Sequence, residues 1–152
     1  MPFFLMKTEP DVFSIDDLKK KGKTSWDGVR NYMARNHMRA MRRGDLVLIY
    51  HSNADPSGVV GVGRVVKEAH PDLTAQDPKS DYFDPKATPE SPRWDMVDVA
   101  FEQKLPRIVS LAEMKRDSAL AGMEVTKKGS RLSVHPVLEA HFKHVLELGR
   151  SG

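Results

Sequence analysis

A continuous apolar run from Leu46 to His51 most constrains what this chain can fold into. The run reads Leu-Val-Leu-Ile-Tyr-His, so apolar side chains fall on both faces of an extended segment. Such a strand is stable only where other structure covers both of its faces, so the run predicts a central strand of a sheet. A second apolar run, at residues 3–6, predicts another buried strand. Pro10 follows it and ends it, because proline cannot donate a hydrogen bond to a strand ladder.

The pattern around these two runs predicts one domain that combines a sheet with helices. Capping boxes at Ser14 and Ser110 begin two short helices. Further helices are expected at residues 31–43 and 136–148, and further strands at residues 58–69, 94–101 and 131–134. Because neighbouring strands look joined by hairpins rather than by crossing helices, we predict an α+β fold over residues 1–152. Its sheet is expected to be strongly curved, barrel-like and mainly antiparallel.

Two glycines and a proline-rich segment predict where the backbone departs from regular strands and helices. Gly61 and Gly63 fall on one face of an expected strand, which predicts a sharp bend or a close approach of other atoms to its backbone. Residues 70–92 hold five of the ten prolines, with Tyr82 and Phe83 between two Asp-Pro-Lys turns. An aromatic pair inside a long polar loop predicts an ordered loop with a function.

The charge of the chain is unevenly distributed along the sequence. The net charge is only +3, but residues 1–50 hold 10 basic and 6 acidic residues whereas residues 51–100 hold 5 and 9. Residues 19–43 contain nine basic residues and a single acid, Asp27. An excess of this kind is a candidate footprint for polyanions, and a solvated helix face is the alternative interpretation.

The sequence contains no recognisable catalytic motif. It has no cysteine, which excludes a disulfide framework, a thiol nucleophile and a cysteine-ligated metal. It also has no Gly-x-Ser-x-Gly, phosphate-loop or dinucleotide-binding glycine pattern. His141 and His144 have a spacing that could hold a metal, but no matching carboxylate pair is evident, so we expect a surface or interhelical role for them and neither a metal nor a cofactor.

Residues 24–36 carry the most specific pattern in the chain. The segment places one tryptophan, two asparagines, a serine and two arginines in a loop that enters a helix. An extruded nucleobase needs a flat aromatic surface and donors and acceptors for its edge, so this mixture is typical of a base-binding pocket. Arg35, Arg39 and Arg42 share one face of the helix and are predicted to bind phosphates. The alternative is that Trp26 is a core residue and Asn31 only a helix cap.

Several longer motifs resemble the EVE domain family over almost the whole chain. They are Lys7-Thr8-Glu9-Pro10, Ser25-Trp26-Asp27-Gly28-Val29-Arg30-Asn31-Tyr32, the segment from Gly44 to Ser52, the segment from Val60 to Val66, Asp77-Pro78-Lys79-Ser80, Pro92-Arg93-Trp94 and Arg131-Leu132-Ser133-Val134. The resemblance implies a PUA-like fold and a reader of modified bases, notably of cytosine modified at its fifth ring carbon, in DNA or RNA.

The resemblance also implies a set of ligand-binding residues. Trp26 would be the stacking wall, and the ends of the first and central strands would face the base. The full set is Lys7, Thr8, Glu9, Ser25, Trp26, Asn31, Tyr32, His51, Ser52, Tyr82, Trp94 and Ser133. Met33 stands where many relatives are expected to have a glutamine, which bears on specificity if that glutamine contacts the ligand.

Two other functions stay open at this point. A small hydrolase of modified nucleosides would use Lys7, Thr8 and Glu9, and a protein-interaction module would present the arginine helix to an acidic partner. We favour a non-enzymatic, monomeric nucleic-acid reader without membrane contact. Such a protein is expected in the cytoplasm, or in the nucleus of a eukaryote.

Overall fold

Strand β3 (Leu46–His51) lies inside the sheet, as its apolar run predicts. In the computed structural model, which describes residues 2–150, the strand order is β2–β5–β4–β3–β1–β6. β1 and β3 are parallel and every other neighbouring pair is antiparallel. The strands are β1 (Phe3–Thr8), β2 (Lys23–Trp26), β4 (Gly58–Pro71), β5 (Asp95–Ser110) and β6 (Val134–Val137). The predicted α+β fold with a mainly antiparallel sheet is therefore confirmed.

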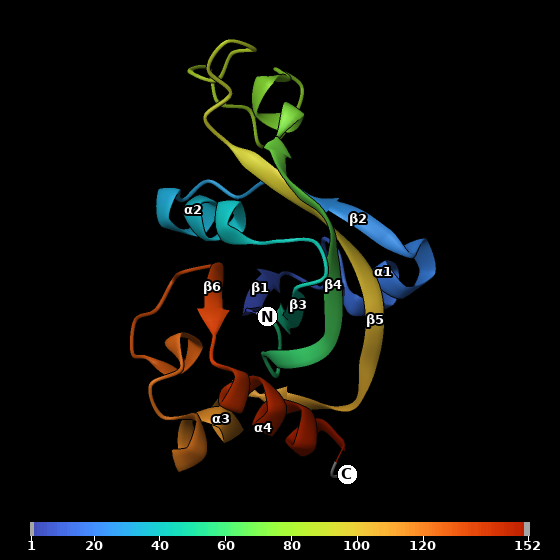
Figure 1. The fold of residues 1–152 in the computed structure, drawn as a ribbon, viewed down its shortest axis with the longest axis vertical. Coiled ribbons are helices and arrows are strands. Elements are labelled where there is room, and N and C mark those ends of the chain that lie inside the picture. The colour runs from blue at the N-terminus through green and yellow to red at the C-terminus, as the bar shows by residue number, and fades with distance from the viewer. Residues whose placement is uncertain (1, 151–152) are drawn as a thin grey trace.

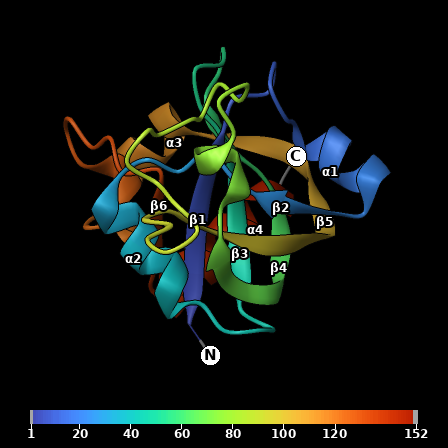
Figure 2. The same ribbon diagram turned by 90° about the horizontal axis from the view of Figure 1, so that it is seen from above.

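Four helices surround the sheet (Figures 1 and 2). They are α1 (Ile15–Lys21), α2 (Tyr32–Ala40), α3 (Leu111–Arg116) and α4 (Glu139–Arg150), with short 3-10 turns at Leu73–Gln76, Ser118–Leu120 and Glu124–Thr126. The two edge strands β2 and β6 are not paired with each other, so the curved sheet stays open. Helix α2 contacts β6, β5 and β4 and so spans this opening. Within residues 2–150, no helix combines the length and the apolar character that a membrane crossing requires.

The C-terminal elements differ from the sequence-based expectation. The last strand was expected at residues 131–134 and the last helix from Pro136, but β6 covers Val134–Val137 and α4 begins at Glu139. Pro136 lies opposite Phe4 within β6. An edge strand tolerates this proline because one side of the strand has no partner that needs its missing N–H. The helix-start signal of proline is thus overridden by strand pairing.

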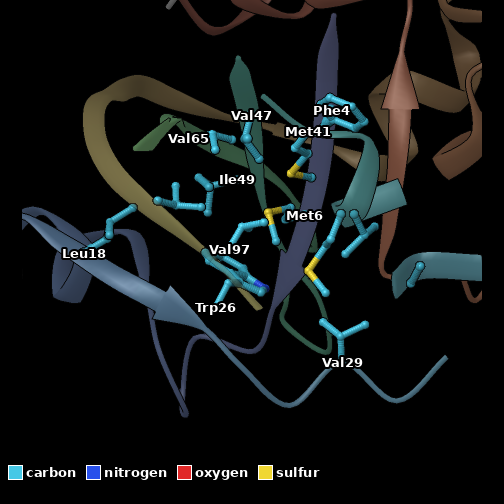
Figure 3. Close-up of a cluster of buried hydrophobic side chains, with 14 of the residues drawn as sticks. Phe4, Met6, Leu18, Trp26, Val29, Met41, Val47, Ile49, Val65 and Val97 are labelled. Atoms are coloured by element: carbon cyan, nitrogen blue, oxygen red, sulfur yellow. The ribbon is translucent and has the colours of Figure 1, made fainter. Parts of the chain in front are cut away.

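The two faces of the sheet bury separate hydrophobic clusters. Phe4 and Met6 of β1 belong to the first cluster, which also holds Trp26 and side chains of α1 and α2 (Figure 3). Phe3 and Leu5, which alternate with them, belong to the second cluster, which α4 covers with Phe142 and Val145. This double coverage is what the apolar run of β3 requires.

Gly61 and Gly63 allow β4 both to bend and to pack closely against α1 and β5. The register between β4 and β5 shifts at both glycines, which is the predicted irregularity. A Cβ on Gly61 would lie 2.6 Å from Cδ1 of Ile15 on α1. A Cβ on Gly63 would lie 2.5 Å from Cγ1 of Val99 on β5. Both predicted reasons for glycine, a bend and a close approach, are therefore present.

We expect Gly63→Ala to lower the free energy of unfolding by about 1–3 kcal/mol, because the new methyl group overlaps a methyl group of Val99. Urea denaturation of a double-mutant cycle with Val99→Ala measures the effect. The double variant should lose less stability than the two single variants together, since removing Val99 makes room for the new methyl. Strictly additive losses would contradict this account of Gly63.

Candidate functional site

A cavity of about 610 Å³ opens where β1 and β2 end. Its wall combines the end of β1 and the turn after it, the last residue of α1, β2 with the loop that follows, and two residues from distant loops. The lining residues are Lys7, Thr8, Glu9, Val12, Phe13, Lys21, Thr24, Ser25, Trp26, Asp27, Gly28, Val29, Arg30, Tyr82 and Ser133. A volume of this size is typical of pockets for small organic groups.

The structure brings seven of the sequence-predicted site residues together in this wall. They are Lys7, Thr8, Glu9, Ser25, Trp26, Tyr82 and Ser133. Four separate stretches of the chain contribute them, so they meet only because β1, β2 and two loops converge at one end of the sheet.

Trp26 belongs both to the core and to the cavity wall. It is the last residue of β2, it pairs in register with Val97 of β5, and only 8% of it is exposed. It packs beside Val97 in the first cluster, to which Val29 also belongs (Figure 3). The same residue lines the cavity. A core tryptophan and an aromatic wall were alternatives in the sequence, and the structure gives this one residue both positions.

Polar groups in the wall are held by neighbouring strands and loops. The Thr8 hydroxyl donates to the Phe13 carbonyl at 2.7 Å, and the Ser25 hydroxyl donates to the Asp98 carboxylate at 2.8 Å. The Glu9 carboxylate accepts a hydrogen bond from the Asn53 amide at 3.3 Å. These bonds fix the side chains while their remaining oxygen lone pairs stay available to accept hydrogen bonds.

Lys7 lies at the boundary between the two faces of the sheet. Strand alternation puts it on the side of Phe3 and Leu5, and its ammonium nitrogen lies 5.6 Å from the centre of the Tyr50 ring. Burial lowers the pKa of Lys7, and the Glu124 carboxylate opposes this shift. The residue lines the cavity, but its charged end rests against an aromatic ring of the second cluster.

Five sequence-predicted residues lie outside the cavity wall. They are Asn31, Tyr32, His51, Ser52 and Trp94. Asn31 caps α2 by accepting a hydrogen bond from the Ala34 N–H at 2.9 Å. His51 accepts the N–H of Ile15 at the start of α1 at 3.0 Å, and the backbone of Ser52 pairs with the end of β1. Asn31, His51 and Ser52 therefore stabilise secondary structure next to the cavity.

Tyr32 and Trp94 stack on each other beside the cavity. Their ring centres are 4.7 Å apart with an angle of 21° between the planes. Trp94 is buried with Ala75 and Ala87 in a small cluster of its own, and its indole N–H donates to the Asp84 carboxylate at 2.7 Å. Trp94 is therefore the anchor of the proline-rich loop, which projects beyond the sheet in Figure 1.

The three arginines predicted to bind phosphates differ in the ion pairs and hydrogen bonds that they form within the protein. Arg39 forms an ion pair with Asp95 of β5. Arg42 lies beyond the end of α2 at Ala40, so it does not share the helix face on which it was predicted, and it donates weakly to the Arg39 and Met41 carbonyls. Arg35 donates to the Arg93 carbonyl at 2.7 Å and, within residues 2–150, pairs with no carboxylate. Met33 on the same helix is 61% exposed and does not line the cavity.

The residue that organises the wall, Asp72, was missed by the sequence analysis. Its carboxylate is fully buried and accepts hydrogen bonds from the Gly28 N–H at 2.9 Å, from Arg30 at 3.0 Å and from the Thr74 hydroxyl at 2.6 Å. Burial raises its pKa, but these hydrogen bonds outweigh burial and hold the pKa below its ordinary value. Burial, followed by the Asp72 charge, raises the pKa of the neighbouring Asp27.

Arg30 and Gly28 attach Tyr82 to the cavity wall. Arg30 donates two hydrogen bonds to the Tyr82 carbonyl, at 2.7 and 3.0 Å. Gly28 has a φ of +81°, and a Cβ there would lie 2.8 Å from the Tyr82 ring. Arg30 stands within the Ser25–Tyr32 motif and could have been singled out. Asp72 had no comparable signal, since it lies far along the chain in a loop that is rich in acids.

Comparison with known proteins gives a consistent result. Residues 2–148 match the model of the EVE domain family. Thymocyte nuclear protein 1 of Homo sapiens is 39% identical over 164 residues, which cover 95% of this chain and 72% of that protein. A crystal structure of a protein from Pseudomonas putida superposes with a TM-score of 0.95 at 44% identity, covering 97% of this chain and 99% of that one.

A further match is a crystal structure of human THYN1 in complex with DNA that contains 5-methylcytosine. It superposes with a TM-score of 0.93 at 38% identity and covers 100% of this chain and 99% of the other.

We expect Asp72→Asn to lower the free energy of unfolding by about 1–3 kcal/mol, because it leaves the partly exposed Arg30 guanidinium without its buried counter-charge. Asp95→Asn is the matched control, since it breaks the Arg–Asp pair in which Arg39 is 48% exposed. That control should cost less than about 1 kcal/mol. Equal losses of the two variants in urea denaturation would contradict the role given to Asp72.

We expect stability to fall when the pH drops from neutral into the acidic range, in part through His51. Burial lowers the pKa of His51 in the folded state, where the neutral ring accepts the Ile15 N–H. The unfolded chain therefore binds a proton at a higher pH than the folded chain, so protonation below the ordinary histidine pKa favours unfolding.

Burial also lowers the pKa of His37 and His135, so His51→Gln should reduce this pH dependence without abolishing it. Unfolding free energies at neutral and mildly acidic pH measure the slope for both proteins. An unchanged slope in the variant would rule out a contribution from His51.

Proposed function

The chain belongs to the EVE domain family, and from this membership and the geometry of the cavity we propose that it is a reader of modified bases. It binds nucleic acid and holds an extruded base, a modified cytosine, in the cavity beside Trp26. The observation that carries the proposal is the full-length superposition on human THYN1 in complex with DNA that contains 5-methylcytosine.

The wall of the cavity supports this proposal chemically. Trp26 offers an aromatic surface that the core holds rigid, and stacking of a base on such a surface contributes about 1–3 kcal/mol. Thr8, Glu9, Ser25 and Ser133 line the same cavity and can bond to the polar edge of a base. The apolar Val29, also in the wall, offers contact to a methyl group. An aromatic surface with polar groups around it suits a flat heterocycle.

We propose that the protein binds its ligand without converting it. The hydrolase alternative depends on Lys7 as a base or charge in the cavity, whereas the Lys7 ammonium rests near the Tyr50 ring. The relatives named above, one of them in complex with DNA, also favour binding over turnover. A partner of this kind implies that the protein works where nucleic acid is, in the cytoplasm of a bacterium or the nucleus of a eukaryote.

We expect the protein to bind DNA that carries one 5-methylcytosine more tightly than the same DNA with unmodified cytosine, and Trp26→Leu to remove most of this preference. The substitution keeps an apolar side chain in the first cluster but takes away the stacking surface, which should weaken binding of the modified DNA about 5- to 150-fold. Fluorescence anisotropy at fixed salt measures both affinities.

Phe101→Leu is the matched control for this experiment. Phe101 packs against the same cluster but does not line the cavity, so its loss should lower stability without changing the preference for the modified base. If both DNAs bind the native protein equally well, or if the two variants behave alike, the proposed function is wrong. Turnover of a modified nucleoside that is lost in Lys7→Ala would support the hydrolase instead.

A further inference from the structure

We propose that Tyr32, with Arg35 and Arg93, forms a second nucleotide site, which takes an unpaired nucleobase next to the extruded one. This inference rests on the proposed function and adds a preference for single-stranded over closed double-stranded nucleic acid.

The exposed ring of Tyr32 is the first observation. Tyr32 is 49% exposed although one face of its ring stacks on the buried Trp94. The guanidinium carbon of Arg35 lies 4.7 Å from the centre of the Tyr32 ring and 5.9 Å from that of Trp94. A group on the far face of Tyr32 would lie much farther from Trp94, so Arg35 flanks the stack and leaves that face open. The stack is therefore a rigid platform with one free aromatic surface.

Positive charge surrounds this platform. Arg93 donates to the Tyr32 hydroxyl, and its guanidinium carbon lies 5.9 Å from the centre of the ring. Its Nε atom lies 3.4 Å from an Asp84 carboxylate oxygen, which compensates part of its charge. The Arg35 guanidinium bonds to the Arg93 carbonyl and to the Asn36 amide oxygen but to no carboxylate within residues 2–150, so its charge is uncompensated and can attract a phosphate.

Backbone strain is concentrated at the same place. Arg93 has a φ of +64°, a left-handed conformation that residues other than glycine rarely adopt. The Arg35 guanidinium bonds to the Arg93 carbonyl at 2.7 Å and helps to hold this conformation. Strained residues persist where the surroundings over-determine them, and they cluster at binding sites. Here the strained residue is Arg93, whose side chain lies beside the exposed ring of Tyr32.

A continuous row of rings and guanidinium groups connects the platform to the cavity. The Arg30 guanidinium carbon lies 5.8 Å from the centre of the Tyr82 ring and 5.6 Å from that of Trp94. Arg30 and Tyr82 line the cavity, whereas Trp94 carries Tyr32. A strand whose modified base enters the cavity would therefore bring a neighbouring nucleotide to Tyr32.

The free face of Tyr32 can accept only a base whose own face is uncovered. In a closed duplex each base is covered by its neighbours on both faces, whereas a single strand can splay its bases onto aromatic side chains. Stacking of this kind tolerates any base, so the site would add affinity without adding sequence preference. The expected ligand is thus a single strand, or a locally melted site, that contains the modified base.

The test combines protein variants with abasic nucleotides in single-stranded DNA that contains one 5-methylcytosine. An abasic nucleotide is placed in turn at each position on either side of the modified base, and affinities are measured by fluorescence anisotropy. With the native protein, one flanking position should cost about 5- to 150-fold in affinity. Tyr32→Leu should bind the intact strand correspondingly more weakly and should lose the penalty at that position.

Two control variants separate stacking from structure. Tyr32→Phe keeps the aromatic ring and should retain both the affinity and the abasic penalty. Phe83→Leu removes another exposed aromatic, one that is 40% exposed in the proline-rich loop, and should change neither. If Tyr32→Leu fails to fold, the native protein alone decides, because a scan without any costly flanking position overturns the inference.

The outcomes also distinguish this inference from the proposed function. If the native protein prefers the modified base but shows the same abasic penalties as Tyr32→Leu, only the second site is wrong. Tighter binding to the closed duplex than to the single strand would overturn it as well. If the native protein shows no preference for the modified base on either strand form, the reader function itself fails.

Discussion

The buried carboxylate of Asp72 is the interaction on which the candidate site depends. It joins the loop after β2 to the turn after β4, because Gly28, Arg30 and Thr74 all donate to it. Arg30 in turn binds the Tyr82 carbonyl, so the proline-rich loop is fixed to the same point. A buried carboxylate is stable only when its oxygens are satisfied, and satisfying them sets the distance between these three segments. The cavity wall follows from that requirement.

Ion pairs within the protein also reduce the positive charge that the basic stretch presents to a ligand. The basic stretch at residues 19–43 contacts the acidic stretch that follows at two places, where Arg30 pairs with Asp72 and Arg39 pairs with Asp95. Two of the nine basic residues in this stretch are thereby neutralised within the protein, and Arg35 is the predicted phosphate-binding arginine that lies beside the exposed ring of Tyr32. From the proposed function we therefore expect a modest, salt-sensitive affinity for a polyanion, with selectivity set in the cavity.

Local patterns predicted most of the fold, and the family resemblance singled out seven of the residues that line the cavity. The apolar run of β3 and the serine N-caps of α1 and α3 act through near neighbours, so the sequence alone indicated them. Pairing across the sheet overrode such a signal at Pro136, which β6 holds opposite Phe4. The Asp72–Arg30 pair joins residues 42 positions apart, and no periodicity reports a contact between two loops. The structure was needed to find it.

The position of Trp26 links stability to the proposed selectivity. Its ring packs in the first cluster and forms the cavity wall, so the wall cannot move without disturbing the core. A wall that is fixed before binding loses little conformational freedom when a ligand enters, which favours discrimination between bases that differ by one methyl group. Tyr82 and Tyr32 are more exposed and attached through loops and stacking. Under the proposed function, Trp26 would give the modified base a wall fixed by the core, and the Tyr32–Trp94 stack would give a neighbouring nucleotide a second, more exposed surface.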